Sequence, residues 1–156
     1  MLFSSCFSYH AQIDSQTRKK FRKTEKETAY VINPKEFLTE YNILKKSKMY
    51  NLTSDSATQL KIKINKLIRY RFRGCATPQA TVLIFSLGQF PVYFEENFSY
   101  KLDEIRNDKI KQIELKLMVE KRVWFWDILS WRKNINRELS LSLRQEKMKK
   151  INLYTK

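Results

Sequence analysis

The hydrophobic pattern of the chain has a period of two in two long stretches. From Leu60 to Arg73 most apolar residues occupy even positions, and from Ile113 to Val119 apolar residues alternate with polar ones. A period of two indicates an extended strand with one buried face. Both stretches therefore predict strands, and Lys66 and Leu67 interrupt the rule in the first one.

Other stretches follow a helical period or none. Asn33 followed by Pro34 is typical of a helix N-cap and first helical residue, and apolar residues at helical spacing continue the pattern to Met49. The small polar residues from Thr53 to Thr58 predict a loop. The dense run of tryptophans and aliphatic residues from Glu120 to Trp131 predicts a helix.

The remaining signals are short. Gln79 to Leu87 is an apolar helix or strand, and Gly88 and Pro91 are expected to set the junction into a following strand. Leucines alternate from Leu139 to Leu143 and predict a last strand. Alternating strands with a few helices favour an α+β fold, in which a small antiparallel or mixed sheet has helices packed on one face.

The chain of 156 residues is long enough for one domain. We expect residues 1–32 to form a basic N-terminal arm and residues 33–156 to form a single α+β domain. The arm contains a dense basic cluster, which comes before the first stretch with a helical or strand pattern. We expect the arm to become ordered when it binds its partner. The cluster consists of Arg18, Lys19, Lys20, Arg22 and Lys23.

Charge indicates the class of partner. Lys and Arg number 31 against 16 Asp and Glu, which leaves a formal net charge of +15. An excess of this size favours a polyanionic partner, and nucleic acid is the first candidate before an anionic membrane surface. No apolar run reaches the roughly 18 residues that a spanning helix requires, so membrane insertion is not expected.

Candidate chemistry is sparse. His10 is the single histidine, and Cys6 and Cys75 have no metal-binding spacing, so they are interpreted as free thiols. Two glycines are too few for a phosphate-binding loop. The acids between Glu95 and Asp108 are mixed with cations, as in a solvated hairpin. The sequence thus predicts no catalytic residue, metal site or cofactor, and favours a binding protein over an enzyme.

The strongest binding signal is a basic stripe within the first predicted strand. It has six cations and no acid, and either contacts phosphates or forms an ordinary solvated strand face; we favour phosphate contact. On one face of an extended segment, cations recur about every 6 to 7 Å. The stripe consists of Lys61, Lys63, Lys66, Arg69, Arg71 and Arg73.

Several short motifs occur in the order of a known family. They are LKIKIN at 60–65, LGQFPV at 87–92, SYKL at 99–102, IELKLMVEKRVWFWDIL at 113–129 and LSLSLRQEK at 139–147. Together they resemble the large-subunit ribosomal protein five family, which binds five-S ribosomal RNA. The resemblance covers roughly residues 36–154, implies the α+β fold, and adds Gln89 and Lys101 to the expected RNA-binding residues.

The resemblance also implies a function and partners. The chain is expected to be a structural constituent of the large ribosomal subunit, in the central protuberance near the P-site transfer RNA and the small-subunit interface. Its partners would be ribosomal RNA and neighbouring large-subunit proteins. Through the hairpin at 95–109 it would also reach transfer RNA and a small-subunit protein.

Composition indicates the compartment. Lys, Asn, Ile, Phe and Tyr are abundant while Gly and Pro are scarce, as in AT-rich organelle genomes, so a mitochondrial ribosome and organelle encoding are expected. The first thirteen residues are apolar and Ser-rich without an acid, which also occurs in presequences. Two alternatives remain at this point: a basic accessory subunit of a respiratory complex, and a fragment of a nucleic-acid enzyme such as a maturase.

Overall fold

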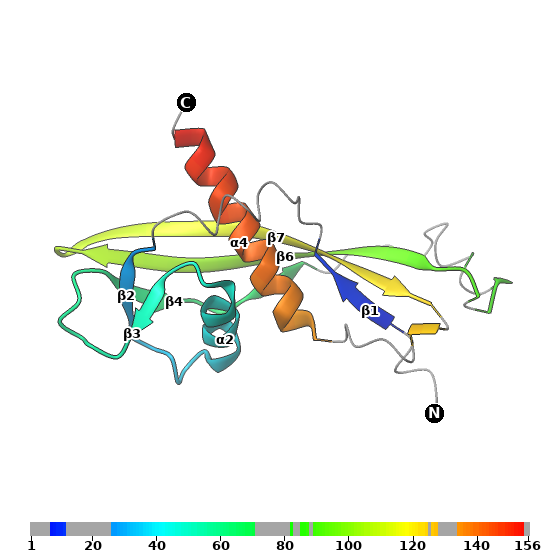
Figure 1. Cartoon of the computed structure of the whole chain (residues 1–156), viewed down its shortest axis with the longest axis horizontal. Helices are drawn as coiled ribbons and strands as arrows, with labels where there is room; N and C mark the ends of the chain where they lie inside the picture. Colours follow the sequence, from blue (N-terminus) through cyan, green and yellow to red (C-terminus); the bar gives the residue numbers. More distant parts are fainter. Residues whose placement is uncertain are drawn as a thin grey trace.

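The computed structural model describes residues 7–11, 26–70, 82, 85–87, 89–124, 126–127 and 134–154. Within these residues a curled, mixed sheet is accompanied by two helices (Figure 1). The strands are β1 (Phe7–His10), β2 (Thr28–Val31), β3 (Asn51–Thr53), β4 (Lys61–Ile64), β5 (Ile68–Tyr70), β6 (Val92–Arg106) and β7 (Lys109–Val123). The helices are α2 (Leu38–Ser47) and α4 (Ile135–Tyr154).

A long hairpin of β6 and β7 spans the molecule (Figure 1). Each strand has 15 residues and is therefore about 50 Å long. Asn107 and Asp108 connect the strands with φ angles of 46° and 61°, the pair of positive values that a tight two-residue hairpin turn requires. The strand predicted from Ile113 to Val119 is confirmed as part of β7. As expected, β6 begins directly after Pro91, whereas Gly88 lies outside the described residues.

The other strands extend this hairpin on both sides. The order is β1-β7-β6-β4-β2-β3, and β5 also pairs with β6. β2 runs parallel to both β3 and β4, while the other pairings are antiparallel. β1 and β2 come from the region expected to be an arm, so these two segments belong to the sheet. The basic cluster at 18–23 lies outside the described residues.

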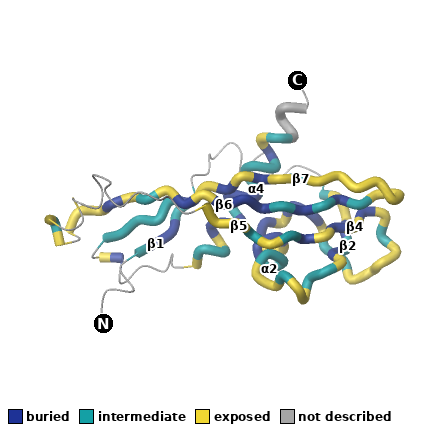
Figure 2. Tube along the Cα trace, turned by 180° about the vertical axis from the view of Figure 1, so that it is seen from behind, coloured by how far each residue is buried: buried dark blue, intermediate teal, exposed yellow. Residues whose placement is uncertain are grey.

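The core lies on one face of the sheet, under α2 and α4. Seen from behind, the strands are in front of both helices (Figure 2). Burying one large aliphatic side chain stabilises a fold by roughly 1.5 to 3 kcal/mol, and the core joins many of them from both helices and from most of the strands. Its central side chains are Ile43, Leu44, Tyr100, Leu102, Leu115, Leu117, Leu139 and Leu143. The predicted α+β class is confirmed.

The helix predicted from Asn33 is confirmed as α2 but begins later, at Leu38. Asn33 does not cap it. The Asn33 side chain accepts a hydrogen bond from the Ile64 N–H at 2.9 Å and donates one to the Ile64 carbonyl at 2.9 Å. The Asn33 side chain thus makes the two hydrogen bonds that the backbone of a neighbouring strand would make with Ile64. Because Asn33 is held beside β4, four more residues follow before the helix begins at Leu38.

The strand predicted at Leu139 to Leu143 is wrong, because these residues lie in α4. Leu139 and Leu143 are both buried and are four residues apart, which is also the spacing of one helical face. Ser140 and Ser142 are buried as well. Small buried serines between the leucines gave the sequence a false period of two.

The helix predicted from Glu120 to Trp131 is also wrong over its described part. Residues up to Val123 continue β7, because Val123 pairs with Phe7 on one side and with Val92 on the other. The chain then makes a short turn that includes Trp126, whose side chain is 61% exposed. The rest of the stretch, residues 128–131, lies outside the described residues.

Candidate nucleic-acid interface

The alternation of side chains gives the long hairpin two faces. Even-numbered residues of β6 and odd-numbered residues of β7 lie on the side of α2 and α4, and we call this side the helix face. The opposite side chains form the open face, in front of which none of the described helices lies (Figure 2). Several charged and aromatic side chains of the open face are exposed, namely Lys61, Lys63, Tyr70 and Lys116, and these are accessible to a partner.

The basic stripe is divided between these two faces. Lys63 pairs with Asp103, so Lys61 and Lys63 in β4 lie on the open face. Arg69 in β5 pairs instead with Phe98, a buried residue of the helix face. The link between the two strands changes the register by one residue, and a change of one residue moves side chains to the opposite face. The expectation that the stripe forms a single face is wrong.

Arg69 is engaged inside the protein. Its guanidinium donates a hydrogen bond to Glu96 Oε1 at 2.7 Å and lies 5.9 Å from the centre of the Phe98 ring. Glu96 is buried, and among the described residues its Oε2 has no hydrogen-bond partner. Burial, and next the charge of Glu96, raises the pKa of the nearby Tyr9 hydroxyl. Glu96 therefore requires the cation, and Arg69 is less suited to phosphate contact than Lys61 or Lys63.

The open face carries a surface that we call the lysine strip: Lys61, Lys63, Lys101 and Lys116. Beside Lys116 the face becomes apolar. Asn97 pairs with Met118 on one side and with Tyr70 on the other. Both side chains are exposed: Met118 by 41% and Tyr70 by 53%. Lys116 in β7 and Tyr70 in β5 thus flank β6 on the same face of the sheet.

Two acids interrupt the lysine strip, and both are held by neighbouring side chains. Glu114 accepts a hydrogen bond from Ser99 at 2.5 Å and lies 3.7 Å from the Lys101 ammonium. The Ser99 hydrogen bond, together with nearby lysines, lowers the pKa of the Glu114 carboxyl. Asp103 accepts a hydrogen bond from Asn65 at 3.3 Å. Four lysines against two acids leave a positive surplus on this surface.

The remaining predicted residues are dispersed. Lys66 is exposed in the link between β4 and β5. The Gln89 side chain is exposed at the far end of the hairpin, where the Gln89 carbonyl accepts a hydrogen bond from Trp124 at 2.9 Å. Arg71, Arg73 and the cluster at 18–23 lie outside the described residues. The structure thus brings together only three of the predicted residues on the open face, namely Lys61, Lys63 and Lys101.

Sequence reasoning missed two residues of this surface. Lys116 was counted only as a polar position of a strand, and Tyr70 was assigned to the apolar side of the stripe. Both reach the open face because of cross-strand register: Lys116 pairs with Ser99, and Tyr70 pairs with Asn97. The interruption at Lys66 was the signal in the sequence that the faces change.

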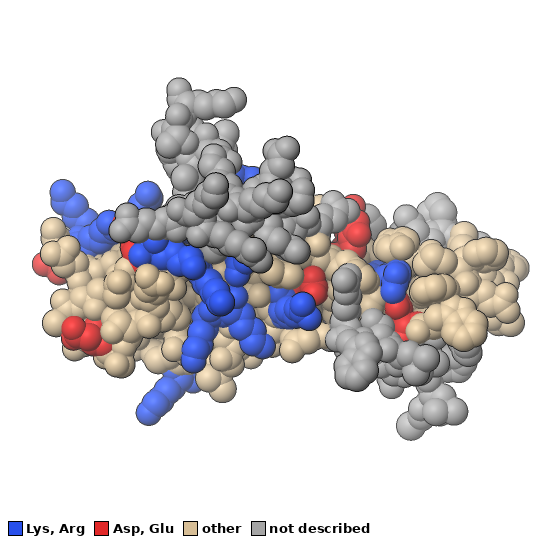
Figure 3. Space-filling model, viewed as in Figure 1, with Lys and Arg blue, Asp and Glu red and all other residues tan. Residues whose placement is uncertain are grey.

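A second group of cations lies on the helix side, over α2 and α4 (Figure 3). Arg144 donates to the Ser47 carbonyl at 2.9 Å, and Lys147 donates to the Met49 carbonyl at 3.4 Å. Cations at these carbonyls stabilise the C-terminal end of α2. Burial lowers the pKa of the Lys147 ammonium, which lies 3.6 Å from the centre of the Tyr50 ring. These two cations therefore have a structural role.

Three exposed lysines accompany this second group. They are Lys45, Lys46 and Lys48, at and just after the C-terminal end of α2. They lie beside the carbonyls that Arg144 and Lys147 contact, so they form a basic surface on the face opposite to the lysine strip. The two surfaces can therefore be tested separately.

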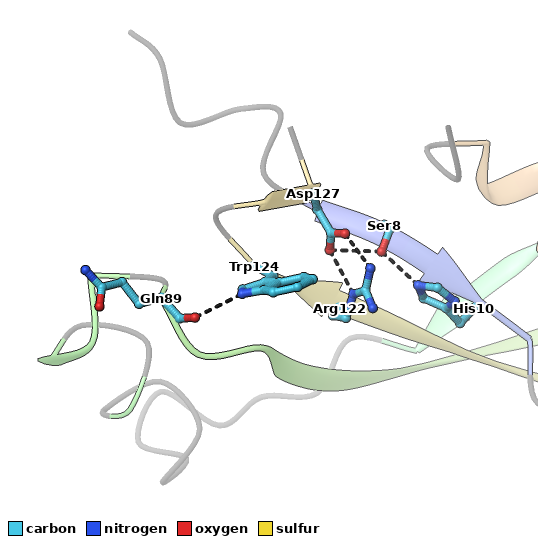
Figure 4. Close-up of polar contacts among 6 residues, drawn as sticks. All are labelled: Ser8, His10, Gln89, Arg122, Trp124 and Asp127. Atoms are coloured by element: carbon cyan, nitrogen blue, oxygen red, sulfur yellow. Dashed lines mark hydrogen bonds and ion pairs between the residues drawn. The ribbon is translucent and has the colours of Figure 1, made fainter. Parts of the chain in front are cut away.

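One cluster has the residue types of a catalytic triad, in the wrong arrangement (Figure 4). Ser8 donates a hydrogen bond to Asp127 at 3.0 Å and lies 2.8 Å from His10 Nε2. Because Ser8 gives its one proton to Asp127, it accepts from His10 rather than being activated by it. Ser8 is fully buried, and Arg122 engages Asp127 at 2.5 and 3.0 Å. The cluster fastens β1 and the turn after β7 to the sheet.

The described part of the chain lacks the features of two other classes of site. There, no three His, Cys, Asp or Glu side chains come together as a metal site would require, and none of the helices has the length and apolar character to cross a membrane. Comparison with protein-family models gives no match to this sequence, and comparison with curated proteins gives none either.

Proposed function

We propose that this protein is a structural constituent of the large subunit of a mitochondrial ribosome, and that the open face of its sheet binds ribosomal RNA. The observation that carries the proposal is the lysine strip beside the exposed Tyr70. The motif resemblance supports the ribosomal assignment, and the net charge of +15 supports a polyanionic partner.

The mechanism is placement of RNA, without chemistry. Lys61 and Lys63 are two residues apart on one strand and are therefore about 6 to 7 Å apart, close to the spacing of phosphates along an RNA strand. The sheet fixes their positions, so phosphate contact costs little further order. An exposed ring such as Tyr70 offers a stacking surface for an unpaired base, which is worth roughly 1 to 3 kcal/mol.

The position within the subunit follows from the same resemblance. We place the protein in the central protuberance, where its neighbours are other large-subunit proteins. The turn at Asn107 and Asp108 is the far tip of the long hairpin, and it would point towards P-site transfer RNA or the small subunit.

Salt dependence of RNA binding tests the interface. Each cation that neutralises a phosphate contributes roughly 0.7 to 0.9 to the slope of log affinity against log salt. Changing Lys61, Lys63 and Lys116 together to Gln should flatten the slope for a ribosomal RNA fragment by about 2 to 3. The matched control changes Lys45, Lys46 and Lys48 to Gln, which removes the same charge from the opposite face and should leave the slope unchanged. A slope flattened only by the Lys45, Lys46 and Lys48 variant would indicate that RNA binds the helix side instead.

Sedimentation of the tagged full chain tests the ribosomal assignment. Co-migration with large-subunit ribosomal RNA is expected. Co-migration with a respiratory complex would instead identify a basic accessory subunit and end the ribosomal proposal.

A further inference from the structure

The end of the hairpin farthest from its turn exposes apolar side chains instead of charged ones. In the space-filling view this right-hand end is mostly tan (Figure 3). We call this surface the apolar end. It consists of Val82 (47% exposed), Phe85 (84%), Leu87 (83%), Phe90 (65%), Tyr93 (49%) and Trp126 (61%). No Lys, Arg, Asp or Glu occurs from Gly74 to Phe94, although 30% of the chain is charged.

Specific contacts hold these side chains outward. The Trp124 indole N–H donates to the Gln89 carbonyl at 2.9 Å, which joins the turn after β7 to the segment before β6. Asp127 is buried and bound by Arg122, so the turn between them holds Trp126 in the exposed position (Figure 4). Leu87 adopts a φ of 49°, a conformation that is unfavourable for a leucine. The Trp124 and Arg122 contacts thus fix the segment before β6 and the turn after β7, which both contribute to the apolar end.

The size of the apolar end matches a functional patch. An aromatic side chain offers roughly 150 to 250 Å², so four rings that are each exposed by about half or more present on the order of 500 Å² of apolar surface. Patches of about 300 to 600 Å² are the largest on typical monomers and are often binding sites. Water contact with this much apolar surface is costly, and a partner would remove the cost.

Charge distinguishes between the classes of partner. RNA and anionic membranes both require free cations at the contact. Arg122, which is the partner of Tyr93 on the neighbouring strand, is already bound by Asp127. Glu95 is exposed next to Tyr93 on the same face and would repel an anion. A second copy would bring two highly positive chains together. Aromatic enrichment with depletion of charge is instead typical of the centre of a protein interface.

We propose that the apolar end docks onto a different protein, in an apolar groove bordered by Lys or Arg that faces Glu95. The aromatic side chains fill the groove, while the border cations meet the acid at the edge. This contact does not depend on RNA binding, because the lysine strip lies nearer the turn of the hairpin and uses different residues.

Site-specific cross-linking tests the proposal. The full chain carries a photo-reactive benzoylphenylalanine in place of Phe90, and it is irradiated in an extract of the cells that make the protein. The expected product is an adduct with one protein, whose cross-linked peptide is apolar and adjoins Lys or Arg. The same probe in place of Tyr70, on the open face, should not form this adduct.

Two further variants make the test specific. Combining the probe with Trp126→Ser should lower the adduct yield about tenfold or more, as expected for loss of an aromatic anchor. Glu95→Lys should lower it by a smaller factor, and Lys109→Glu, a charge reversal beside the turn of the hairpin and outside the lysine strip, should leave it unchanged. An adduct with RNA, with lipid or with a second copy would overturn the proposal, as would no adduct at all. None of these outcomes would alter the salt slope measured for the lysine strip.

Discussion

The two halves of the long hairpin differ in what they bury and what they expose. Near the turn, α2 and α4 cover one face, and lysines and paired acids occupy the other. At the far end, aromatic side chains are exposed and a run of uncharged sequence replaces the lysines. The two surfaces thus lie at different ends of the same hairpin, and neighbouring segments contribute most of their residues. Near the turn, the helices bury the apolar side chains, so the exposed face can be charged. At the far end, no described helix covers the apolar side chains, so they remain available to a partner.

This difference separates two kinds of binding by their response to salt. Contacts between lysines and phosphates release counterions and weaken as salt rises. Contacts between apolar surfaces are nearly indifferent to moderate salt and depend on the area removed from water. In the same salt titration, RNA binding at the lysine strip should therefore weaken, whereas docking at the apolar end should hardly change.

The largest expected effect contrasts the core near the turn with the apolar end. Leu143→Ala should lower the free energy of unfolding by about 2 to 5 kcal/mol, because Leu143 is fully buried among the core side chains. Phe85→Ala should change it by less than about 0.5 kcal/mol, because the Phe85 side chain is 84% exposed. Urea unfolding monitored by circular dichroism measures both.

A third leucine makes this comparison sharper. Leu141 lies between Leu139 and Leu143 in sequence but is only half-buried, because a helix turns it away from the core. Leu141→Ala should therefore cost clearly less than Leu143→Ala. Equal losses for all three leucines would support a strand and contradict α4.

Much of the fold near the turn could be predicted from the sequence. The alternation from Ile113 to Val119 was reliable because that strand has one buried and one exposed side over its whole length. The pattern from Leu139 to Leu143 was misleading because leucines that alternate with serines fit the two-residue period of a strand, while Leu139 and Leu143 also fit one face of a helix. The stretch after Glu120 was misleading because strand pairing with β1, which is distant in sequence, outweighs the local signal of closely spaced aromatic residues.

The candidate site was predicted less completely than the fold. A stripe of cations indicates a class of partner, but which side each cation faces depends on register with β6, which no single strand encodes. Lys116 joined the surface only through pairing with β6. The apolar end left a clear sign in the sequence, the absence of charge from Gly74 to Phe94, whereas the exposure of its side chains required the structure.

The next prediction tests the division of the basic stripe. Arg69→Gln should lower the free energy of unfolding by about 1 to 2 kcal/mol, because it leaves the buried Glu96 carboxylate without its cation. This value is less than for a fully buried pair, since the Arg69 side chain is 50% exposed. Lys63→Gln, on the open face, should change stability by less than about 0.5 kcal/mol. Equal small effects for both variants would show that Arg69 does not stabilise Glu96 and is a solvated cation like Lys63.

The smallest expected effect concerns an acid on the open face. The Ser99 hydrogen bond is the main cause of the lowered pKa of Glu114, whose ordinary value is 4.5. A carboxyl with a lowered pKa in the folded state stabilises the fold above the unfolded-state value, and this contribution disappears as the pH falls through the folded-state value. Ser99→Ala should therefore lower the urea midpoint slightly at about pH 7, and the difference from wild type should shrink once the pH falls below about 4.5. Ser142→Ala is the matched control, because the hydrogen bond that Ser142 accepts, from the Met118 N–H at 3.1 Å, involves a backbone group and not a carboxylate. Its effect should stay constant over the same range, so parallel pH profiles for the two variants would show that Ser99 does not act through Glu114.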